Sequence, residues 1–273
     1  MHIIVPIKQV PETSNVKMDP ESGTMVRTGV EAIVNPLDLY AIEAALRLRE
    51  QVGGRVTTLS MGPPKAETAL REAISMGCDD GVLLSHRKFA GADTWATAYT
   101  LAQAIRKIGA YDLIICGERA TDGDTGQVGP GIAAFLDLPL ATYVSQILAA
   151  GADGLRVERL VEGGAEIVWS PLPTVLTVVK EVAYPRLPTL RGKQRAKRTE
   201  APVWGPEEIE ADPDCIGLSG SPTRVVSIDK PKVARQGVRV RVKRPEDVER
   251  FAAQVVDFLQ DEQLLVGVGE GER

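Results

Sequence analysis

A glycine-rich loop after a short apolar run is the part of the sequence whose residue types point most directly to chemistry. Leu113 to Cys116 has the length and apolar character of a buried strand, and glycines follow at 117, 123, 126 and 129. A helix-like apolar segment, Ile132 to Leu136, comes next. Glycines let the backbone approach a ligand closely, and the free N–H groups of a helix N-terminus attract anions. The pattern favours a nucleotide phosphate.

An ordinary glycine-rich surface loop would share this composition. The spacing of the glycines matches neither G-x-G-x-x-G nor a Walker A loop, so both interpretations stay open on the loop alone.

Two further segments carry residue types suited to binding at the start of a helix. They are Asn35-Pro36-Leu37-Asp38 and Gly91-Ala92-Asp93-Thr94, each followed by a helix-like run. Asn35 and Asp93 are favourable N-cap residues, so plain helix capping would also explain both segments. In a parallel sheet the strand-to-helix junctions share one edge, which would bring both segments to the glycine loop.

Alternating strand-like and helix-like runs predict the elements that position these segments. Strands are expected at 2–7, 55–60, 81–85 and 113–116, and helices at 37–52, 64–76 and 93–108. Glycines at 53, 77 and 109 mark the helix ends. The βαβα order predicts the α/β class: a Rossmann-like, mostly parallel sheet with helices on both faces.

The pattern changes after about residue 140. Runs at 155–160 and 165–169 around two glycines predict a hairpin, and a further strand is expected at 174–180. Residues 199–245 are rich in Pro, Gly and Asp and predict an extended arm. The amphipathic run 245–259 predicts a terminal helix, which would fold back on its own domain or dock on a partner.

A basic run precedes the arm and has three interpretations. Its cationic residues are Arg186, Arg191, Lys193, Arg195, Lys197 and Arg198. A solvated loop is one interpretation, and nucleic-acid binding is disfavoured because the run contains no aromatic residue to stack on a base. The third is a docking surface for an acidic protein, with Leu190 as an apolar anchor amid exposed charge.

Composition excludes several classes of protein. A net charge of −5 argues against nucleic-acid binding by the whole molecule, and no apolar run is long enough to span a membrane. Three scattered cysteines fit a reducing compartment, and the expected location is the cytoplasm, since the sequence opens without a signal segment. Two histidines and no paired carboxylates leave little material for a catalytic triad, a metal site or acid–base catalysis.

Taken together, the motifs resemble the beta subunit of electron-transfer flavoproteins over nearly the whole chain. The residues that carry the resemblance are Val5-Pro-Ile-Lys8-Gln-Val-Pro11, Asn35-Pro36, Ser60-Met-Gly-Pro63, Gly91-Ala-Asp-Thr94, Cys116-Gly117, Ala120 to Pro130 and Pro185-Arg-Leu-Pro-Thr-Leu-Arg-Gly192.

The resemblance implies a heterodimer. An alpha subunit would hold one FAD, residues 1–198 would form the nucleotide-binding domain, and residues 199–273 would form a C-terminal arm and helix that dock on the alpha subunit. The implied recognition loop spans 183–197, with Leu190, Arg191 and Lys193 contacting an acyl-CoA dehydrogenase-type flavoenzyme.

The resemblance also implies the residues of a nucleotide site. They are Pro6, Asn35, Pro36, Leu37, Asp38, Met61, Asp93, Thr94, Ala120, Thr121, Asp122, Gly123, Asp124, Thr125, Gly126, Gln127, Val128, Gly129, Pro130 and Gly131. The family implies no metal and no catalytic side chain of the protein, because a flavin carries the chemistry.

Two branches of the family differ in the second nucleotide. The motifs Asp122-Gly-Asp-Thr125 and Gln127-Val-Gly-Pro130 resemble those of the electron-bifurcating branch, in which a second FAD accepts a hydride from NADH. One electron would then pass to the alpha-subunit FAD and the other to a low-potential acceptor such as ferredoxin or flavodoxin. Gly126 departs from the alanine usual in that branch.

The alternatives are a simple electron carrier with structural AMP, and a small nucleotide-binding stress protein. The stress protein would leave the arm and the basic run unexplained.

Overall fold

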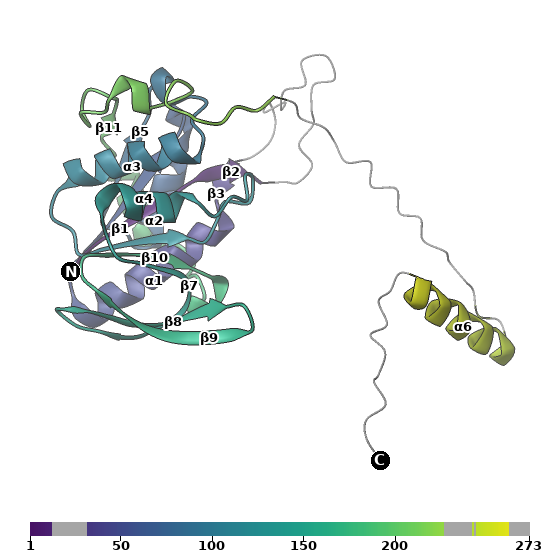
Figure 1. Ribbon diagram of the computed structural model, residues 1–273. Helices are drawn as coiled ribbons and strands as arrows, with labels where there is room; N and C mark the ends of the chain where they lie inside the picture. Colours follow the sequence, from purple (N-terminus) through teal and green to yellow (C-terminus); the bar gives the residue numbers. More distant parts are fainter. Residues whose placement is uncertain (13–31, 227–241, 243, 262–273) are drawn as a thin grey trace. The chain divides into compact units, whose positions relative to one another are not determined.

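The computed structural model describes residues 1–12, 32–226, 242 and 244–261 (Figure 1). The chain divides into two compact units, Met1–Val226 and Ser227–Arg273. The first unit holds all the predicted strand-to-helix junctions. In the second, the described residues form the amphipathic helix α6, Pro245–Asp261, as the sequence predicted.

The elements of the first unit alternate as expected from the sequence. The strands are β1 His2–Ile7, β2 Gln9–Pro11, β3 Ala32–Val34, β4 Arg55–Met61, β5 Asp80–Leu84, β6 Leu113–Gly117, β7 Leu140–Ala150, β8 Gly154–Val161, β9 Gly164–Pro171, β10 Thr174–Val178 and β11 Val203–Trp204. The α-helices are α1 Pro36–Val52, α2 Glu67–Met76, α3 Thr94–Ile108, α4 Val128–Leu136 and α5 Leu190–Arg198. Short 3₁₀ turns lie at Pro64–Ala66, Arg87–Phe89, Lys180–Val182 and Pro213–Cys215.

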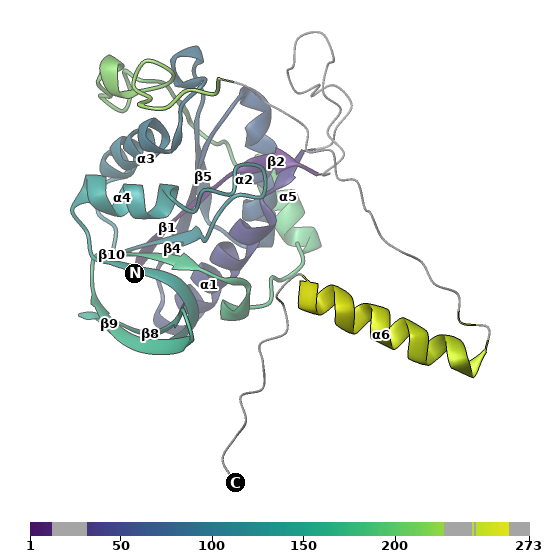
Figure 2. The same cartoon turned by 45° about the vertical axis from the view of Figure 1, so that its right-hand side comes forward.

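The strands within the described residues form a nine-stranded sheet in the order β11-β5-β4-β1-β6-β10-β7-β8-β9. Figure 2 labels β5, β4, β1 and β10 in the parallel part and β8 and β9 at one end. Every pairing from β11 through β7 is parallel, whereas β8 and β9 continue the sheet antiparallel. A separate two-stranded ribbon pairs β2 with β3. The predicted fold class, a mostly parallel α/β sheet with helices on both faces, is confirmed.

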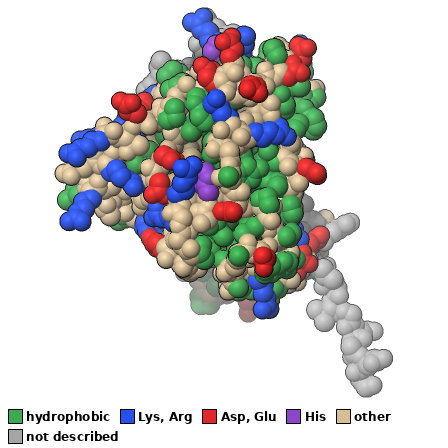
Figure 3. All heavy atoms as spheres, turned by 90° about the vertical axis from the view of Figure 1, so that its left-hand side faces the viewer, with side chains coloured by type: hydrophobic (Ala, Val, Ile, Leu, Met, Phe, Trp, Pro, Cys, Tyr) green, Lys and Arg blue, Asp and Glu red, His purple; other side chains and the backbone are tan. Residues whose placement is uncertain are grey.

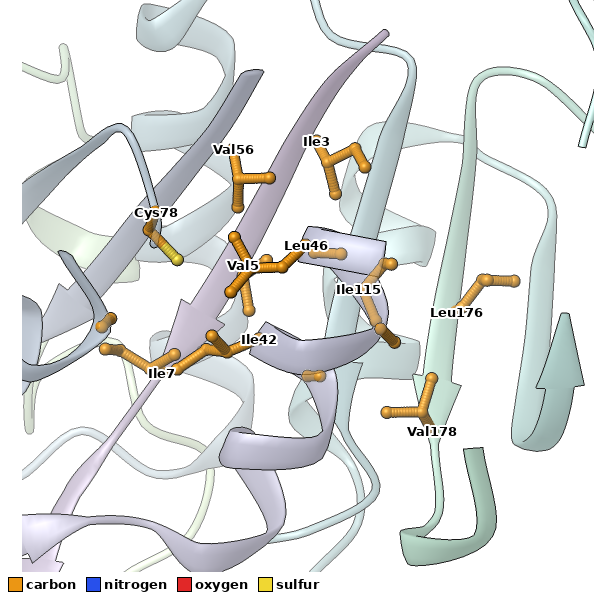
Figure 4. Packing of buried hydrophobic residues seen from close by; sticks show 14 of the residues in the cluster. Ile3, Val5, Ile7, Ile42, Leu46, Val56, Cys78, Ile115, Leu176 and Val178 are labelled. Carbon is orange, nitrogen blue, oxygen red and sulfur yellow. The ribbon is translucent and has the colours of Figure 1, made fainter. Parts of the chain in front are cut away.

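Strand β1 shows why the sheet needs helices on both faces. Ile3, Val5 and Ile7 belong to the core under α1 and α2, and Ile42 and Leu46 meet them from α1 (Figure 4). Ile4 points the other way, into the core under α3 and α4. Successive residues of a strand face opposite sides, so an unbroken apolar run requires cover on both.

Strand β7 is the one long element of the described sheet that the sequence pattern did not indicate. Its pairing with β8 shifts register twice, between Val144 and Gln146 and between Ile147 and Ala149. Tyr143 also has a φ of 55°. Such bulges break the alternation of apolar and polar residues that marks a strand in a sequence. The neighbouring hairpin of β8 and β9 is confirmed.

The structure differs from the sequence prediction after residue 189 in two respects. Residues from Leu190 onward form helix α5 and not an irregular loop, with Thr189 Oγ1 accepting a capping bond from Gly192 N at 2.9 Å. The segment after residue 198 does not leave the domain at once. It adds β11 to the sheet beside β5 and buries Ile209 and Ile216 in the core under α3. The first compact unit therefore extends to Val226.

The surface carries mixed charge. On the face in Figure 3, basic and acidic side chains are interspersed, and no broad field of one sign covers that face. None of the described helices is long and apolar enough to cross a membrane.

Candidate functional site

A cavity of about 480 Å³ lies where β1, β4 and β6 end. The chain moves outward from β1 toward β5 on one side and from β6 toward β7 on the other, so the cavity lies at the topological switch point of the sheet. Such crevices at the carboxyl ends of parallel strands are the usual ligand sites of open α/β sheets. We call this hollow the switch-point cavity.

Most of the residues predicted for a nucleotide site line the switch-point cavity. They are Pro6, Asp38, Met61, Asp93, Thr94, Ala120 and residues 123–129. The remaining predicted residues do not line it: Asn35, Pro36, Leu37, Thr121, Asp122, Pro130 and Gly131. The predicted convergence of three strand-to-helix junctions on one edge is therefore present in the fold.

Asn35 supports the site from behind. It occupies the N-cap position of α1, as predicted, but its side chain forms no capping bond there within the described residues. Its Nδ2 instead donates to the Arg119 carbonyl at 2.9 Å, and its Oδ1 accepts from Thr121 N at 3.1 Å. The fully buried amide thereby ties the glycine loop to the start of α1.

The glycine loop, residues 117–127, contains two left-handed residues, and ion pairs connect it to Lys8 and across its own residues. Asp124 and Gly126 have φ values of 53° and 63°. Lys8 Nζ lies 2.7 Å from Asp122 Oδ1, and Arg119 Nη1 lies 3.2 Å from Asp124 Oδ1. The loop is therefore held from both β1 and its own flank.

The predicted ligand role of the glycines divides between two kinds of position. A Cβ at Gly129 would lie 2.6 Å from Thr177 Cγ2, so this glycine lets α4 pack against β10. A Cβ at Gly123 would meet no described atom within 4 Å, so the space beside it is open to a ligand. The missing side chain is therefore needed for packing at Gly129, whereas at Gly123 it leaves space for a ligand.

The N-terminus of α3 is closed by the chain itself. Asp93 Oδ1 accepts from Ala96 N at 3.0 Å, and Oδ2 accepts from Thr223 N at 3.0 Å and Thr223 Oγ1 at 2.8 Å. Desolvation opposes ionisation of Asp93, but these hydrogen bonds outweigh it and lower the pKa of the carboxyl. Asp93 was predicted to contact the ligand, yet both its oxygens have protein partners.

The N-terminus of α4 is different. Gln127 stands at its N-cap position without a side-chain capping bond to any described group, and Val128 and Gly129 line the switch-point cavity. Gln127 Oε1 instead accepts from Thr94 Oγ1 at 2.9 Å. The first N–H groups of α4 are therefore the donors available to an anion in the cavity.

Asp38, in the first turn of α1, is the buried carboxyl of the site. It is 7% exposed, and its Oδ2 accepts from Lys8 N at 2.7 Å. Burial raises the pKa of Asp38 to about 7, against the opposing effect of hydrogen bonds from Lys8 and Asn35. This carboxyl changes charge near neutral pH.

Several lining residues were absent from the predicted set. Lys8, Gly91 and Cys116 lie within the quoted family motifs, so the motifs contained a signal for them. Thr97 and Leu101 follow Thr94 at helical spacing on one face of α3, which is a periodicity that could have been followed. Phe89, in a 3₁₀ turn, had no signal in the sequence.

A second hollow, of about 560 Å³, lies near α2 and α5, by the amino ends of β4 and β5 and not by their carboxyl ends. Two of its three arginines have partners inside the protein, because Arg49 bonds to Asp79 and Arg195 to the carbonyls of Ile74 and Cys78. These contacts serve packing and do not indicate a ligand. Among the described residues, no group of three or more His, Cys, Asp or Glu is placed to hold a metal ion.

The predicted docking residues lie on α5. Leu190 is 81% exposed at the start of this helix, with Arg191 and Lys193 beside it. The helix is fixed on α2, since Arg71 Nη1 donates to the Ala196 carbonyl at 2.6 Å. Leu190 is therefore an apolar side chain presented to solvent from a braced support.

Comparison with known proteins finds relatives over most of the chain. The model of the electron transfer flavoprotein domain matches residues 22–208. An electron transfer flavoprotein beta subunit of Thermoanaerobacterium thermosaccharolyticum is 49% identical over 238 residues, 87% of this chain and 91% of that protein. One of Clostridium acetobutylicum is 42% identical over 265 residues, 97% and 100% of the two chains. The caffeyl-CoA reductase-Etf complex subunit CarD of Acetobacterium woodii is 41% identical over 266 residues, again 97% and 100%.

Proposed function

The chain belongs to the electron transfer flavoprotein family, with beta subunits among its relatives, and on this premise we propose that its switch-point cavity holds FAD. The family transfers electrons, and its beta subunits pair with an alpha subunit. The observation that carries the proposal is the cavity at the switch point, on which the glycine loop and the open N-terminus of α4 converge.

The residues of the cavity fit a nucleotide. The first turn of α4 offers N–H donors to the pyrophosphate, and Gly123 leaves room beside it. A volume of about 480 Å³ lies within the range of roughly 300–1,000 Å³ that small-molecule sites have. Gly91, Ala92 and Gly126 also line the cavity, and none of them has a side chain larger than a methyl group.

Bound there, FAD would supply the chemistry: it would accept a hydride from NADH and pass on single electrons, toward the alpha-subunit FAD and toward ferredoxin or flavodoxin. The protein contributes position and electrostatics. Asp38 sets a titratable charge at the wall of the cavity, and Lys8 with Asp122 braces the loop.

The alternative is AMP in the same cavity, with the heterodimer acting as a simple electron carrier. The test is to reconstitute the purified heterodimer with excess FAD, desalt it, and measure flavin and AMP in each complex. Two flavins, with direct reduction by NADH, support the bifurcating function. One flavin with retained AMP moves the protein to the carrier class.

We propose that the C-terminal part of the chain binds the alpha subunit. Helix α6 exposes the large apolar side chains Val248, Phe251, Val255, Val256 and Phe258 within its own unit. An amphipathic helix with an open apolar face is suited to burial against a partner. A chain that ends at Val226 should fold and lose co-purification with the alpha subunit; a tight heterodimer with that chain would contradict the assignment.

We propose that the surface around Leu190 binds an acyl-CoA dehydrogenase-type flavoenzyme. Tyr184 and Leu187, shortly before Leu190 in the chain, are also exposed. Arg186 bonds to Glu43 and Glu50, so the segment that leads to α5 is fixed on α1. The basic residues of α5 favour an acidic partner. The name of the relative CarD places that protein in a complex with caffeyl-CoA reductase, a comparable kind of partner.

Leu190→Ala tests this surface. Loss of an exposed anchor weakens docking by about 1–3 kcal/mol, so electron transfer to the dehydrogenase should slow while reduction by NADH is kept. Leu160→Ala, at a partly exposed leucine on β8, is the matched control. Equal rates for Leu190→Ala and the control would leave α5 as an ordinary solvated surface.

A further inference from the structure

Residues 90–94 form a wall that has the switch-point cavity on one side and a later segment of the chain on the other. Gly91, Ala92, Asp93 and Thr94 line the cavity. On the opposite side, residues 217–223, which we call the strap, lie against the same wall. Figure 2 shows this late, yellow-green part of the first unit passing beside α3.

The strap is bonded to the wall at successive points. Leu218 N donates to the Ala90 carbonyl at 3.1 Å. Asp93 N donates to Ser221 Oγ at 2.9 Å, and that hydroxyl donates in turn to the Gly217 carbonyl at 2.7 Å. The last contact is made by Thr223, whose N and Oγ1 both donate to Asp93 Oδ2.

The contact between strap and wall is close as well as polar. A Cβ at Gly91, where φ is 76°, would lie 3.3 Å from Leu218 Cβ. A Cβ at Gly217 would lie 1.9 Å from the Lys88 carbonyl oxygen, so only glycine fits there. Ile216, just before the strap, is 2% exposed in the core under α3.

Asp93 joins the two sides because its oxygens have different partners. Oδ1 caps α3 at the rim of the cavity, whereas Oδ2 holds Thr223. A shift of α3's first turn in response to a ligand therefore moves the acceptor of the strap's last bond. Thr223 lies only a few residues before Val226, where the first compact unit ends.

We propose that Asp93 is a positioning residue that couples occupancy of the switch-point cavity to the placement of the C-terminal arm. This inference rests on the proposed binding of a nucleotide in the cavity and of the arm to the alpha subunit. A ligand that packs on the inner side of residues 90–94 orders the wall, and the wall holds the strap from which the arm departs. Coupling of this kind is reciprocal, so nucleotide and alpha subunit each tighten the binding of the other.

The first experiment measures the dissociation constant between the full chain and the FAD-loaded alpha subunit, with and without saturating AMP or FAD. In the wild type, nucleotide should tighten the pair about tenfold, within the usual range of such couplings. Thr223→Val removes the hydroxyl donor to Asp93 and should reduce this tightening while nucleotide still binds. Thr223→Ser keeps the hydroxyl and should restore it.

A second experiment does not depend on a variant. Amide hydrogen exchange of the full chain should slow at residues 218–223 when AMP or FAD is added, although these residues do not line the cavity. Unchanged exchange there with nucleotide bound would overturn the coupling, as would a pair that forms equally tightly with and without nucleotide. Failure of the wild type to bind nucleotide would instead remove the proposed cofactor site, and the coupling with it.

Discussion

Helices α3 and α4 begin at the same cavity but differ in the capping of their N-termini. Helix α3 starts at Asp93, which caps it with a carboxylate that the strap also engages. Helix α4 starts at Gln127, whose side chain caps nothing among the described residues. Helix α1 resembles α3 in this respect, because Asp38 stands in its first turn.

The difference shows how the fold selects one anion position among several helix ends. A helix N-terminus attracts an anion, but the capping carboxylate of Asp93 already satisfies that preference at α3, and the buried Asp38 occupies the first turn of α1. At α4 the N–H groups remain for a ligand. The phosphate of a nucleotide should therefore lie at α4, and the four predictions below test that contrast.

Removing residues 199–226, the part of the first unit that follows α5, should have the largest effect. A chain that ends at residue 198 loses Ile209 and Ile216 from the core, and burial of each stabilises the fold by about 1.5–3 kcal/mol. Its free energy of unfolding in urea should therefore fall by about 3–6 kcal/mol. The chain that ends at residue 226 keeps both isoleucines and should match the full chain. Equal stability of the two truncated chains would mean that residues 199–226 are only loosely attached.

Asp38 should make stability depend on pH. Its folded pKa of about 7 lies above the value of 3.8 for a free carboxyl, so the folded state binds more protons between these pH values. The free energy of unfolding should therefore fall as pH rises from about 4 to 7, by on the order of 4 kcal/mol, and then level off. Asp38→Asn keeps an acceptor for Lys8 N and should flatten the curve. A decline of equal size in the variant would assign the effect to another group.

Gly129→Val should displace the first turn of α4. Its Cβ would stand 2.6 Å from Thr177 Cγ2, and overpacking of this kind costs about 1–3 kcal/mol. The variant should lose the beta-subunit nucleotide and keep the alpha-subunit FAD, as measured by flavin and AMP content. Gly164→Ala, on β9 and outside the cavity lining, is the control, because its Cβ would meet no described atom within 4 Å and the fold should be unaffected. Unchanged nucleotide content in Gly129→Val would refute the role of α4.

Gln127→Asp should have the smallest effect and tests the contrast most directly. It gives α4 the carboxylate that α3 has, and a charge near a helix terminus contributes about 0.3–1 kcal/mol. Binding of AMP or FAD should weaken up to about fivefold at low salt, with less loss at high salt. Gln127→Asn shortens the side chain in the same way without adding the charge, so the difference in affinity between the two variants measures the effect of the charge. Equal affinities of the Asp and Asn variants would place the phosphate elsewhere.

Local signals in the sequence predicted the central part of the molecule well. Apolar runs predicted β1, β4, β5 and β6, and Asn35, Asp93 and Gly109 marked helix ends within one or two residues. Most of the predicted site residues line the switch-point cavity because they occupy strand-to-helix junctions, which a parallel sheet gathers at one edge.

The strand β7 and the helix α5 could not be predicted in this way. Bulges interrupt the alternation of β7, and α5 is almost entirely polar, with Ala196 as its buried residue. Gly192 lowers its helix propensity but permits the close approach to Ser75 on α2. Docking on α2, and not local preference, therefore stabilises this helix.

By itself, the sequence determined the α/β class, the family and the junctions at which a ligand site should form. These depend on short-range periodicity and on residue types that act within one turn. The tertiary structure decided which helix end stays open to a ligand. Thr223, 130 positions later in the chain, donates a hydrogen bond to Asp93 at the start of α3. The side chain of Asn35 bonds to the glycine loop and not to the first turn of α1. Hydrogen bonds between such distant residues form only when the sheet brings them together, so the local sequence carries no signal for them.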